Sequence, residues 1–289
     1  MAEILITGGA GNFGRTLARV FKAQGHGLRI LDLPSCDFSF FDDWENTRII
    51  PGDILDPGSL KRHMDGTDWV FHLAAILPPV SETNRELTFK VNVDGTRNLL
   101  DACTSLSASP KVVFASSISV YGDTSSKEGV IGPDHPVNPD DWYAESKVEA
   151  EQILLASGLP YLNLRISAIV IPAFLDPPEP WPFQQDQRIE FVTLGDLVDA
   201  MTSLQKIETA LNGTLIISGG QEWQMTGEGY VSRWCQVMEI PVDEMIYMDR
   251  PGWLNWYDSS RSQRLLDYQN TPPEAFFKKL EAAVADALA

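Results

Sequence analysis

The stretch that most constrains the fold of this chain is TGGAGNFG, residues 7–14, which lies almost at its start. It follows the short apolar run EILIT, which is typical of a strand buried on both faces. It precedes NFGRTLARVFKAQG, in which apolar residues recur at helical spacing. A strand, a glycine turn and a helix in this order predict a phosphate-binding cradle, because the N–H groups of the helix N-terminus face an anion.

The glycines of this turn have different expected tasks. Gly8 permits a tight turn, Gly11 lets a pyrophosphate approach the backbone, and Gly14 lets the helix and strand pack closely. Asn12 and Phe13 complete the turn and are expected beside the same ligand. An ordinary strand-to-helix turn is the alternative, and the flanking strand and helix favour the cradle.

Strands and helices alternate through the first two-thirds of the chain, which predicts an α/β fold: a Rossmann-type doubly wound parallel sheet. Strands are expected within 3–7, 27–32, 47–54, 68–75, 110–117, 160–167, 188–193 and 213–220. Helices are expected at 12–25, 56–66, 81–106, 140–158 and 194–201, and two more at 227–237 and 273–288. Asp56 and Pro57 are predicted to cap and begin the helix at 56–66.

A carboxylate ends the second predicted strand and suggests which dinucleotide binds. Asp32 can accept hydrogen bonds from both hydroxyls of an adenosine ribose and would repel a 2′-phosphate. The next residue is Leu33, not a basic residue that could hold such a phosphate. Asp32 therefore predicts NAD as the cofactor, the alternative being a surface carboxylate in a loop.

A second constellation supplies chemistry. Tyr143 and Lys147 are four residues apart in YAESK, so a helix would place them on one face. A lysine ammonium about 4 Å from the phenol would lower the pKa of Tyr143 by up to about three units from its usual value near 10. Tyr143 could then act as acid and base on a substrate hydroxyl, and Lys147 could also hold the nicotinamide ribose. Ser117, after the fifth predicted strand, could polarise the same substrate oxygen.

Net charge excludes some partners and leaves others. The chain carries 40 acidic against 22 basic residues, a net charge of −18, so nucleic acid and anionic membranes are not expected partners. No apolar run approaches the roughly 20 residues that span a bilayer. The three cysteines are far apart in the sequence, which predicts no metal site and a cytoplasmic protein. The chain begins directly with a strand, so no signal peptide is expected.

Together these stretches resemble the extended short-chain dehydrogenase/reductase family, the NAD-dependent epimerases and dehydratases that include UDP-galactose 4-epimerase. The resemblance covers about residues 3–200 and rests on TGGAGNFG, GDILD, HLAA, VNVDGTRNLL, SSISVYG, YAESK, LRISAIVIP and FVTLGDLVDA, with a fainter likeness in YDSSRSQRLLDYQ. It implies a homodimer formed through the helices that carry Lys90–Leu106 and Tyr143–Ser157. It also implies further cofactor residues, namely Asp53 and Ile54 beside the adenine, Leu73, Ala74 and Ala75 along the cofactor, and Asn92 and Ser116 near it.

The sequence departs from this family at positions that bear on the reaction. Dehydratases of the family carry an Asp-Glu pair directly after the serine or threonine, whereas Ile118 and Ser119 stand here. Sugar-nucleotide epimerases usually have an asparagine three residues after the arginine of the sixth-strand motif, and here Arg165 is followed by Ala168. These departures disfavour dehydration and weaken the case for a nucleotide substrate.

The predicted domains follow from a change in texture. Residues 171–183 hold five prolines, and the chain becomes aromatic and less regular after residue 219. We therefore predict an NAD-binding Rossmann domain from 1–170 plus 188–218, and a small substrate-binding lobe from 171–187 plus 219–289. The arginines that could hold the diphosphate of a nucleotide substrate are Arg188, Arg233, Arg250, Arg261 and Arg264, the alternative for each being a solvated surface arginine.

The predicted function is that of an enzyme, an NAD-dependent oxidoreductase or epimerase that moves hydride between NAD and a secondary alcohol of a sugar or sugar nucleotide. Tyr143 is the expected acid and base, Lys147 tunes it, and Ser117 polarises the oxygen. Two alternatives remain open: a dehydrogenase or reductase of a smaller non-nucleotide carbonyl compound, and a protein that senses dinucleotide without turnover.

Overall fold

The chain forms two compact units in the computed structural model, which describes residues 1–207 and 211–289. Unit 1 comprises residues 1–120, 139–164, 201–207 and 211–214. Unit 2 comprises residues 121–138, 165–200 and 215–289. Every residue predicted to bind the cofactor or to catalyse lies in unit 1.

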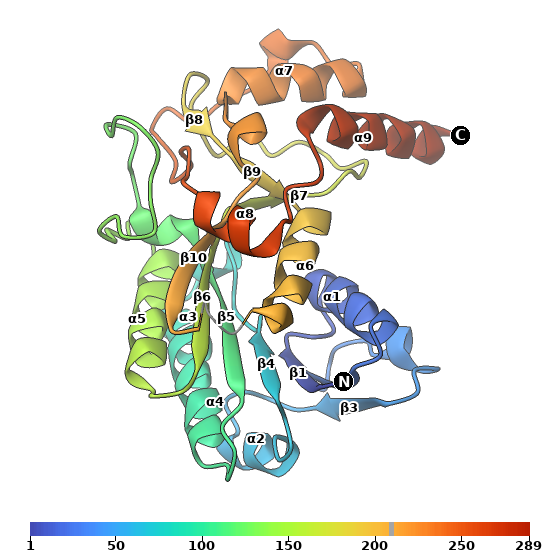
Figure 1. The fold of residues 1–289 in the computed structure, drawn as a ribbon. Helices are drawn as coiled ribbons and strands as arrows, with labels where there is room; N and C mark the ends of the chain where they lie inside the picture. The colour runs from blue at the N-terminus through green and yellow to red at the C-terminus, as the bar shows by residue number, and fades with distance from the viewer. Residues whose placement is uncertain (208–210) are drawn as a thin grey trace. The chain divides into compact units, whose positions relative to one another are not determined.

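The predicted doubly wound sheet is confirmed (Figure 1). Its strands are β1 (Glu3–Thr7), β2 (Gly27–Asp32), β3 (Thr47–Pro51), β4 (Trp69–His72), β5 (Lys111–Ser117), β6 (Tyr161–Ile166) and β10 (Gly213–Ile217). They lie in the order β10-β6-β5-β4-β1-β2-β3, and the pairs from β3 through β5 are parallel. The neighbours of β1 are therefore β2 on one side and β4 on the other, and ligands of open α/β sheets bind where the strand order reverses in this way.

Both faces of this sheet are covered by helices, which explains why its strands read as continuous apolar runs. Leu5 and Val70 point to a core that includes Leu60, Leu99 and Leu154 of the helices α2, α4 and α5. The neighbouring residue on β4, Phe71, points to the opposite face, where its ring lies 4.9 Å from that of Phe21 on α1. The alternation along each strand thus builds two core layers.

The helices that flank the sheet in unit 1 are α1 (Asn12–Ala23), α2 (Pro57–His63), α3 (Arg85–Phe89), α4 (Gly95–Thr104) and α5 (Trp142–Ala156). As predicted, α2 begins at Pro57, and the Asp56 side chain accepts hydrogen bonds from the N–H groups of Gly58 and Ser59. One-turn helical segments occur at Ser39–Phe41, Val80–Glu82, Ile118–Tyr121, Leu204–Lys206, Gln221–Trp223 and Val242–Glu244.

The single helix predicted over residues 81–106 is wrong in detail. A short turn at Val80–Glu82 ends before Asn84, whose extended backbone and side chain cap a new helix by accepting from the N–H of Leu87. That helix then passes through a π-helical turn at Lys90–Asp94 before α4 begins. Apolar periodicity alone detects neither a polar cap inside a helical pattern nor an added residue in a turn.

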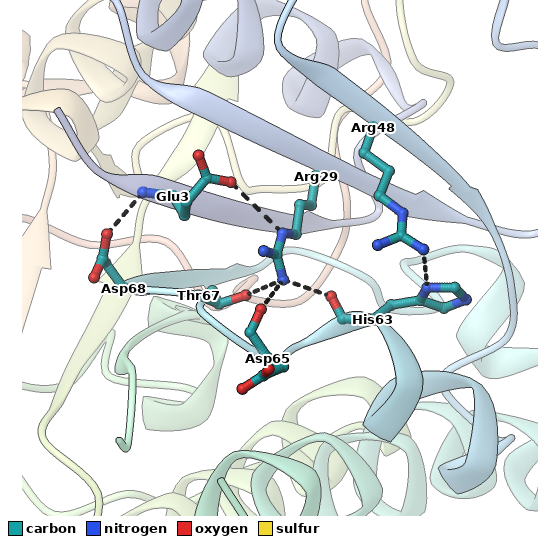
Figure 2. A network of polar contacts seen from close by, with 7 residues as sticks. All are labelled: Glu3, Arg29, Arg48, His63, Asp65, Thr67 and Asp68. Carbon is teal, nitrogen blue, oxygen red and sulfur yellow. Dashed lines mark hydrogen bonds and ion pairs between the residues drawn. The ribbon is translucent and has the colours of Figure 1, made fainter. Parts of the chain in front are cut away.

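Arg29 holds the amino ends of the strands together, as Figure 2 shows. One of its terminal nitrogens donates to the backbone oxygens of His63 and Asp65 and to the hydroxyl of Thr67, at 2.6–3.1 Å. Its Nε lies 3.7 Å from the Glu3 carboxylate. These contacts tie β1 and β2 to the loop before β4, at the end of the strands opposite to the predicted site.

Unit 2 combines short strands with helices packed through aromatic side chains. Its elements are β7 (Ala168–Val170), β8 (Arg188–Ile189), β9 (Phe191–Thr193), β11 (Met225–Thr226), α7 (Gly227–Met238), α8 (Ser260–Leu266) and α9 (Pro273–Leu288), and α6 (Leu194–Ser203) follows β9. The predicted helices at 227–237 and 273–288 are confirmed. Helix α8 is absent from the sequence-based assignment. It has only seven residues, and its cap residue, Ser259, makes no side-chain capping hydrogen bond. Within the described ranges, no helix is both long enough and apolar enough to cross a bilayer.

Candidate active site

The glycine turn has the geometry that its sequence predicts. Gly8 has φ +69°, and a Cβ there would lie 2.8 Å from the backbone nitrogen of Ala74. A Cβ on Gly14 would lie 2.5 Å from the Gly8 oxygen, so only glycine lets α1 start this close to β1. A Cβ on Gly11 would meet only the Gly8 oxygen, at 3.4 Å. The fold itself therefore does not require glycine at position 11, and the space above it suits a ligand that approaches the backbone.

The start of α1 offers its N–H groups to such a ligand. Its N-cap residue is Gly11, which has no side chain, and no side chain caps the helix. Asn12 is exposed and Phe13 is half-buried at this end. Because uncapped N–H groups and the helix dipole attract anions, the residues present fit a pyrophosphate.

Asp32 and Asp53 lie beside the turn, on neighbouring strand ends. The half-buried Asp32 carboxylate accepts hydrogen bonds from the N–H groups of Ala10 and Leu33, each at 2.9 Å. The backbone oxygen of Asp32 accepts from the N–H of Gly52, which holds the loop after β3 beside the end of β2. In that loop the Asp53 carboxylate accepts from the N–H of Leu55. The geometry brings both carboxylates to the carboxyl edge of the sheet.

Other residues implied by the resemblance surround the end of β4. Leu73, Ala74 and Ala75 follow β4 directly and are half-buried. Ile54 is buried and would contact any Cβ added at Gly95 on α4.

Asn92 makes contacts that assign it a structural task. Its side chain, 2% exposed, accepts from the N–H of Ile76 and donates to the Ile76 oxygen and the Ser146 hydroxyl, at 2.7–3.1 Å. It therefore joins the loop after β4 to α5 from within the π-helical turn. A role for Asn92 at the cofactor stays a prediction.

His72, the last residue of β4, joins the end of β1 to the first turn of α4. Its ring nitrogens are hydrogen-bonded to the hydroxyls of Thr7, at 2.7 Å, and Thr96, at 2.9 Å. Burial, and secondarily the charge of Lys147, lowers the pKa of His72 from 6.5 to about 3. The ring is therefore neutral at physiological pH and serves as a hydrogen-bond bridge.

This lowered pKa predicts acid sensitivity. Because the unfolded chain takes up a proton near pH 6.5 and the folded chain only near pH 3, His72 lowers the stability as the pH falls through this range, by about 1.4 kcal/mol per pH unit. His72→Gln should be less stable than wild type at pH 7.5, and the difference should shrink at pH 6 and pH 5. Guanidinium unfolding at the three pH values measures this, and parallel stability curves for the two proteins would rule it out.

The predicted catalytic residues meet at the junction of β5 and α5. The side chain of Tyr143 faces that of Ser117, whose hydroxyl acts to lower the pKa of the phenol. Ser117 also accepts from the N–H of Ser119, which fixes its hydroxyl. The two residues after Ser117 are Ile118 and Ser119, so no carboxylate follows it directly, and both of these side chains are buried.

The expectation for the pKa of Tyr143 is wrong for the polypeptide by itself. Burial raises the pKa of this phenol, and the nearby Asp141 carboxylate raises it further, while the hydrogen bond from Ser117 opposes them. The Lys147 ammonium lies 5.7 Å from the centre of the Tyr143 ring and donates to the Ala115 oxygen at 2.9 Å. The lysine charge is not among the causes that shift this pKa, so the protein alone does not activate Tyr143.

Two residues that the sequence argument did not select support these groups. The Glu82 carboxylate accepts from the N–H groups of Trp142 and Tyr143, at 3.1 and 3.0 Å, and so anchors the start of α5. Glu151 accepts a hydrogen bond from Ser116 at 2.6 Å. Glu151 could have been selected from the sequence, because it lies four residues after Lys147 and so on the same helix face. Glu82 could not, because it lies about 60 residues before α5 in the sequence.

Comparisons with known proteins agree with this architecture. A family model described as the NAD dependent epimerase/dehydratase family matches residues 4–179. D-erythronate dehydrogenase of Cupriavidus necator is 35% identical over 164 residues, which are 53% of this chain and 49% of that protein. UDP-N-acetyl-alpha-D-glucosaminuronate decarboxylase of Bacillus cytotoxicus is 40% identical over 121 residues, 41% of this chain and 37% of that protein. This chain spans about half the length of the curated relatives that it matches.

Solved structures share the fold over nearly the whole chain. A short-chain dehydrogenase/reductase superfamily protein of Agrobacterium tumefaciens with bound NAD has a TM-score of 0.81 at 20% identity, covering 99% of this chain and 98% of that one. MoeE5 in complex with UDP-glucuronic acid and NAD has a TM-score of 0.82 at 24% identity, covering 99% of each chain.

Proposed function

Because the chain belongs to the NAD-dependent epimerase/dehydratase family, we propose that it is an NAD-dependent oxidoreductase or epimerase acting on a secondary alcohol of a sugar-like substrate. The observation that carries the proposal is the placement of Ser117, at the end of β5, beside Tyr143 of α5, with the buried Lys147 one turn further along the same helix face. A protein that only senses dinucleotide would not need this arrangement.

The residues present fit NAD, which when bound accepts or returns the hydride of the carbinol carbon. The uncapped start of α1 would hold the pyrophosphate, and Asp32, beside this turn, would accept from the adenosine ribose hydroxyls. Ser117 orients the substrate oxygen, and Tyr143 takes its proton during oxidation and returns it during reduction. Lys147 donates to the nicotinamide ribose.

The substrate we propose is a sugar or sugar acid. Buried Ile118 and Ser119 stand where an acid would be needed for dehydration, which argues against that reaction. Unit 2 contains a polar cavity of about 320 Å³ lined in part by Ser125, Lys127 and Arg188. The Arg188 guanidinium donates to the Gly129 oxygen and lies 4.7 Å from the centre of the Trp256 ring, and the carboxylates Glu128 and Asp186 line the same cavity.

The similar proteins divide between two substrate classes, free sugar acids and sugar nucleotides. D-erythronate dehydrogenase is named for a small sugar acid, and MoeE5 is described with a sugar nucleotide. Stabilisation of the protein, measured against aldonates, uronates and their UDP and dTDP derivatives in the presence of NAD, would separate the two classes. Turnover of any of them, followed by NADH absorbance, tests the proposed chemistry; an epimerase would convert substrate without accumulating NADH.

We also propose that the protein is a cytoplasmic homodimer. Helices α4 and α5 pack together and carry a surface groove lined by Leu100 and Ile153 among polar residues. Apolar residues in such a groove suit a symmetric helical interface. The three cysteines are free thiols, in keeping with a reducing compartment.

Cofactor choice provides a direct test through Asp32. The unmodified protein should bind NADH more tightly than NADPH, because the carboxylate would repel the 2′-phosphate. Asp32→Ala should weaken NADH binding and reduce or abolish the preference. Fluorescence titration of both dinucleotides measures this, with Asp37→Ala as a matched control, since Asp37 is an exposed carboxylate in the loop after β2. Tighter binding of NADPH to the unmodified protein would contradict the proposal.

A further inference from the structure

Helix α5 extends the Tyr143–Lys147 pair by one more turn. Tyr143, Lys147 and Glu151 follow one another at intervals of four residues, which places them along one stripe of the helix. Each meets a residue of β5: Tyr143 faces Ser117, Lys147 donates to the Ala115 oxygen, and Glu151 accepts from Ser116. Side chains from three successive turns of α5 thus face three consecutive residues of β5.

Glu151 is placed where a charge is costly unless an opposite charge compensates it. Its side chain is 5% exposed and that of Lys147 is 3% exposed. Burial lowers the pKa of Lys147 from 10.5 to about 8, and attraction to Glu151 opposes this. The carboxylate therefore favours the charged form of the lysine, and the lysine compensates the buried carboxylate.

The other groups around Lys147 do not supply this negative charge. On α5, Tyr143 has a raised pKa and is neutral at physiological pH. On β4, His72 is also neutral, because its pKa is about 3. On β5, Phe114 presents its ring 4.9 Å from the ammonium, and Ser116 presents a hydroxyl to Glu151.

We propose that Glu151 is a positioning residue that holds Lys147 in its cationic form, so that cofactor binding depends on a carboxylate that the cofactor does not touch. The inference rests on the proposed function, in which Lys147 donates to the nicotinamide ribose. An uncharged lysine is the weaker donor. Affinity for NADH should accordingly fall as the pH rises through the range in which Lys147 loses its proton.

The first experiment measures the lysine itself and needs no substrate. Protein labelled with [6-¹³C]lysine is titrated by NMR, and Lys147→Met identifies the Lys147 signal. In the wild type this signal should titrate below those of the other lysines. Glu151→Gln should lower its midpoint by at least about one pH unit, because an opposite charge in a buried site moves a pKa by roughly 1–3 units. Glu149→Gln removes the same charge from an exposed position on the same helix and should leave it unchanged.

The second experiment measures NADH binding by fluorescence between pH 6.5 and 9.5. Glu151→Gln should shift the loss of affinity to lower pH and weaken binding about fivefold at pH 8 and close to tenfold at about pH 9, the effect of one unit in the lysine pKa. Glu151→Asp keeps the charge and should restore most of the wild-type pH profile. This variant also keeps the test valid if Glu151→Gln does not fold, since its Lys147 midpoint must then remain close to that of the wild type.

The outcomes separate this inference from the proposed function. If wild-type protein does not bind NADH at all, the proposed function fails, while the NMR titration still tests the charge relation. If NADH binds but the Lys147 midpoint is the same in the wild type, Glu151→Gln and Glu149→Gln, the inference is wrong and the proposed function stands. An equal shift in both glutamine variants would also overturn it, because it would reflect net charge alone.

Discussion

Tyr143→Phe is expected to lose about 100- to 10,000-fold in turnover, the range that general acid–base catalysis contributes. The substitution removes only the phenolic oxygen, whose pKa the neighbouring Ser117 hydroxyl acts to lower. The ring and the start of α5 should remain in place, because Glu82 and Asp141 hold the backbone N–H groups there. Steady-state rates with whichever sugar or sugar nucleotide the wild type turns over, together with NADH affinity and melting temperature, measure the effect.

The pH dependence of the wild type sharpens this test. Since burial raises the pKa of Tyr143, oxidation of the alcohol should accelerate as the pH rises, because more of the phenol can act as a base. The residual rate of Tyr143→Phe should lack this acceleration. Near-normal turnover in the variant, with NADH affinity intact, would remove Tyr143 from the mechanism.

Gly14→Ala should lower the stability of the protein, whereas Gly11→Ala should weaken its binding of NADH. The new Cβ at position 14 would lie 2.5–2.7 Å from backbone atoms of Gly8 and Gly9, which cannot move without opening the turn. Overpacking of this kind costs roughly 1–3 kcal/mol, so the melting temperature should fall by several degrees. Gly11→Ala meets only one atom, at 3.4 Å, and should keep its stability while binding NADH at least about tenfold more weakly.

Thermal unfolding with and without NADH measures both variants. Equal melting temperatures for the two proteins would show that Gly14 is not needed for close packing. Unchanged NADH affinity in Gly11→Ala would show that the cofactor does not approach this part of the backbone.

Much of the architecture could be predicted because it depends on local chemistry. Glycines between a strand and a helix, Asp56 before Pro57, and the i, i+4 spacing of Tyr143 and Lys147 each have a physical cause within a few residues. The structure accordingly confirms the turn, the cap and the shared helix face. The cofactor roles of these residues remain predictions.

The remainder depends on contacts between distant segments. The capping of α5 by Glu82 joins residues about 60 positions apart, and no pattern in either stretch announces it. The raised pKa of Tyr143 follows from burial, which a spacing argument does not measure. Helical spacing alone predicts that the Lys147 charge faces the Tyr143 phenol, whereas the ammonium donates to the backbone of β5.

The π-helical turn at Lys90–Asp94 restricts how this gene product can be shortened or realigned. Removing one residue there would restore regular α-helical winding but rotate Arg85–Phe89 by about 100° relative to α4. Thr88, whose buried hydroxyl donates to the Ser81 oxygen at 2.8 Å, would turn away from its acceptor, and Asn92 would leave the loop after β4. Alignments that place a one-residue gap in this stretch should therefore be read as a change of backbone geometry, and loop-grafting designs should carry residues 81–96 as one block.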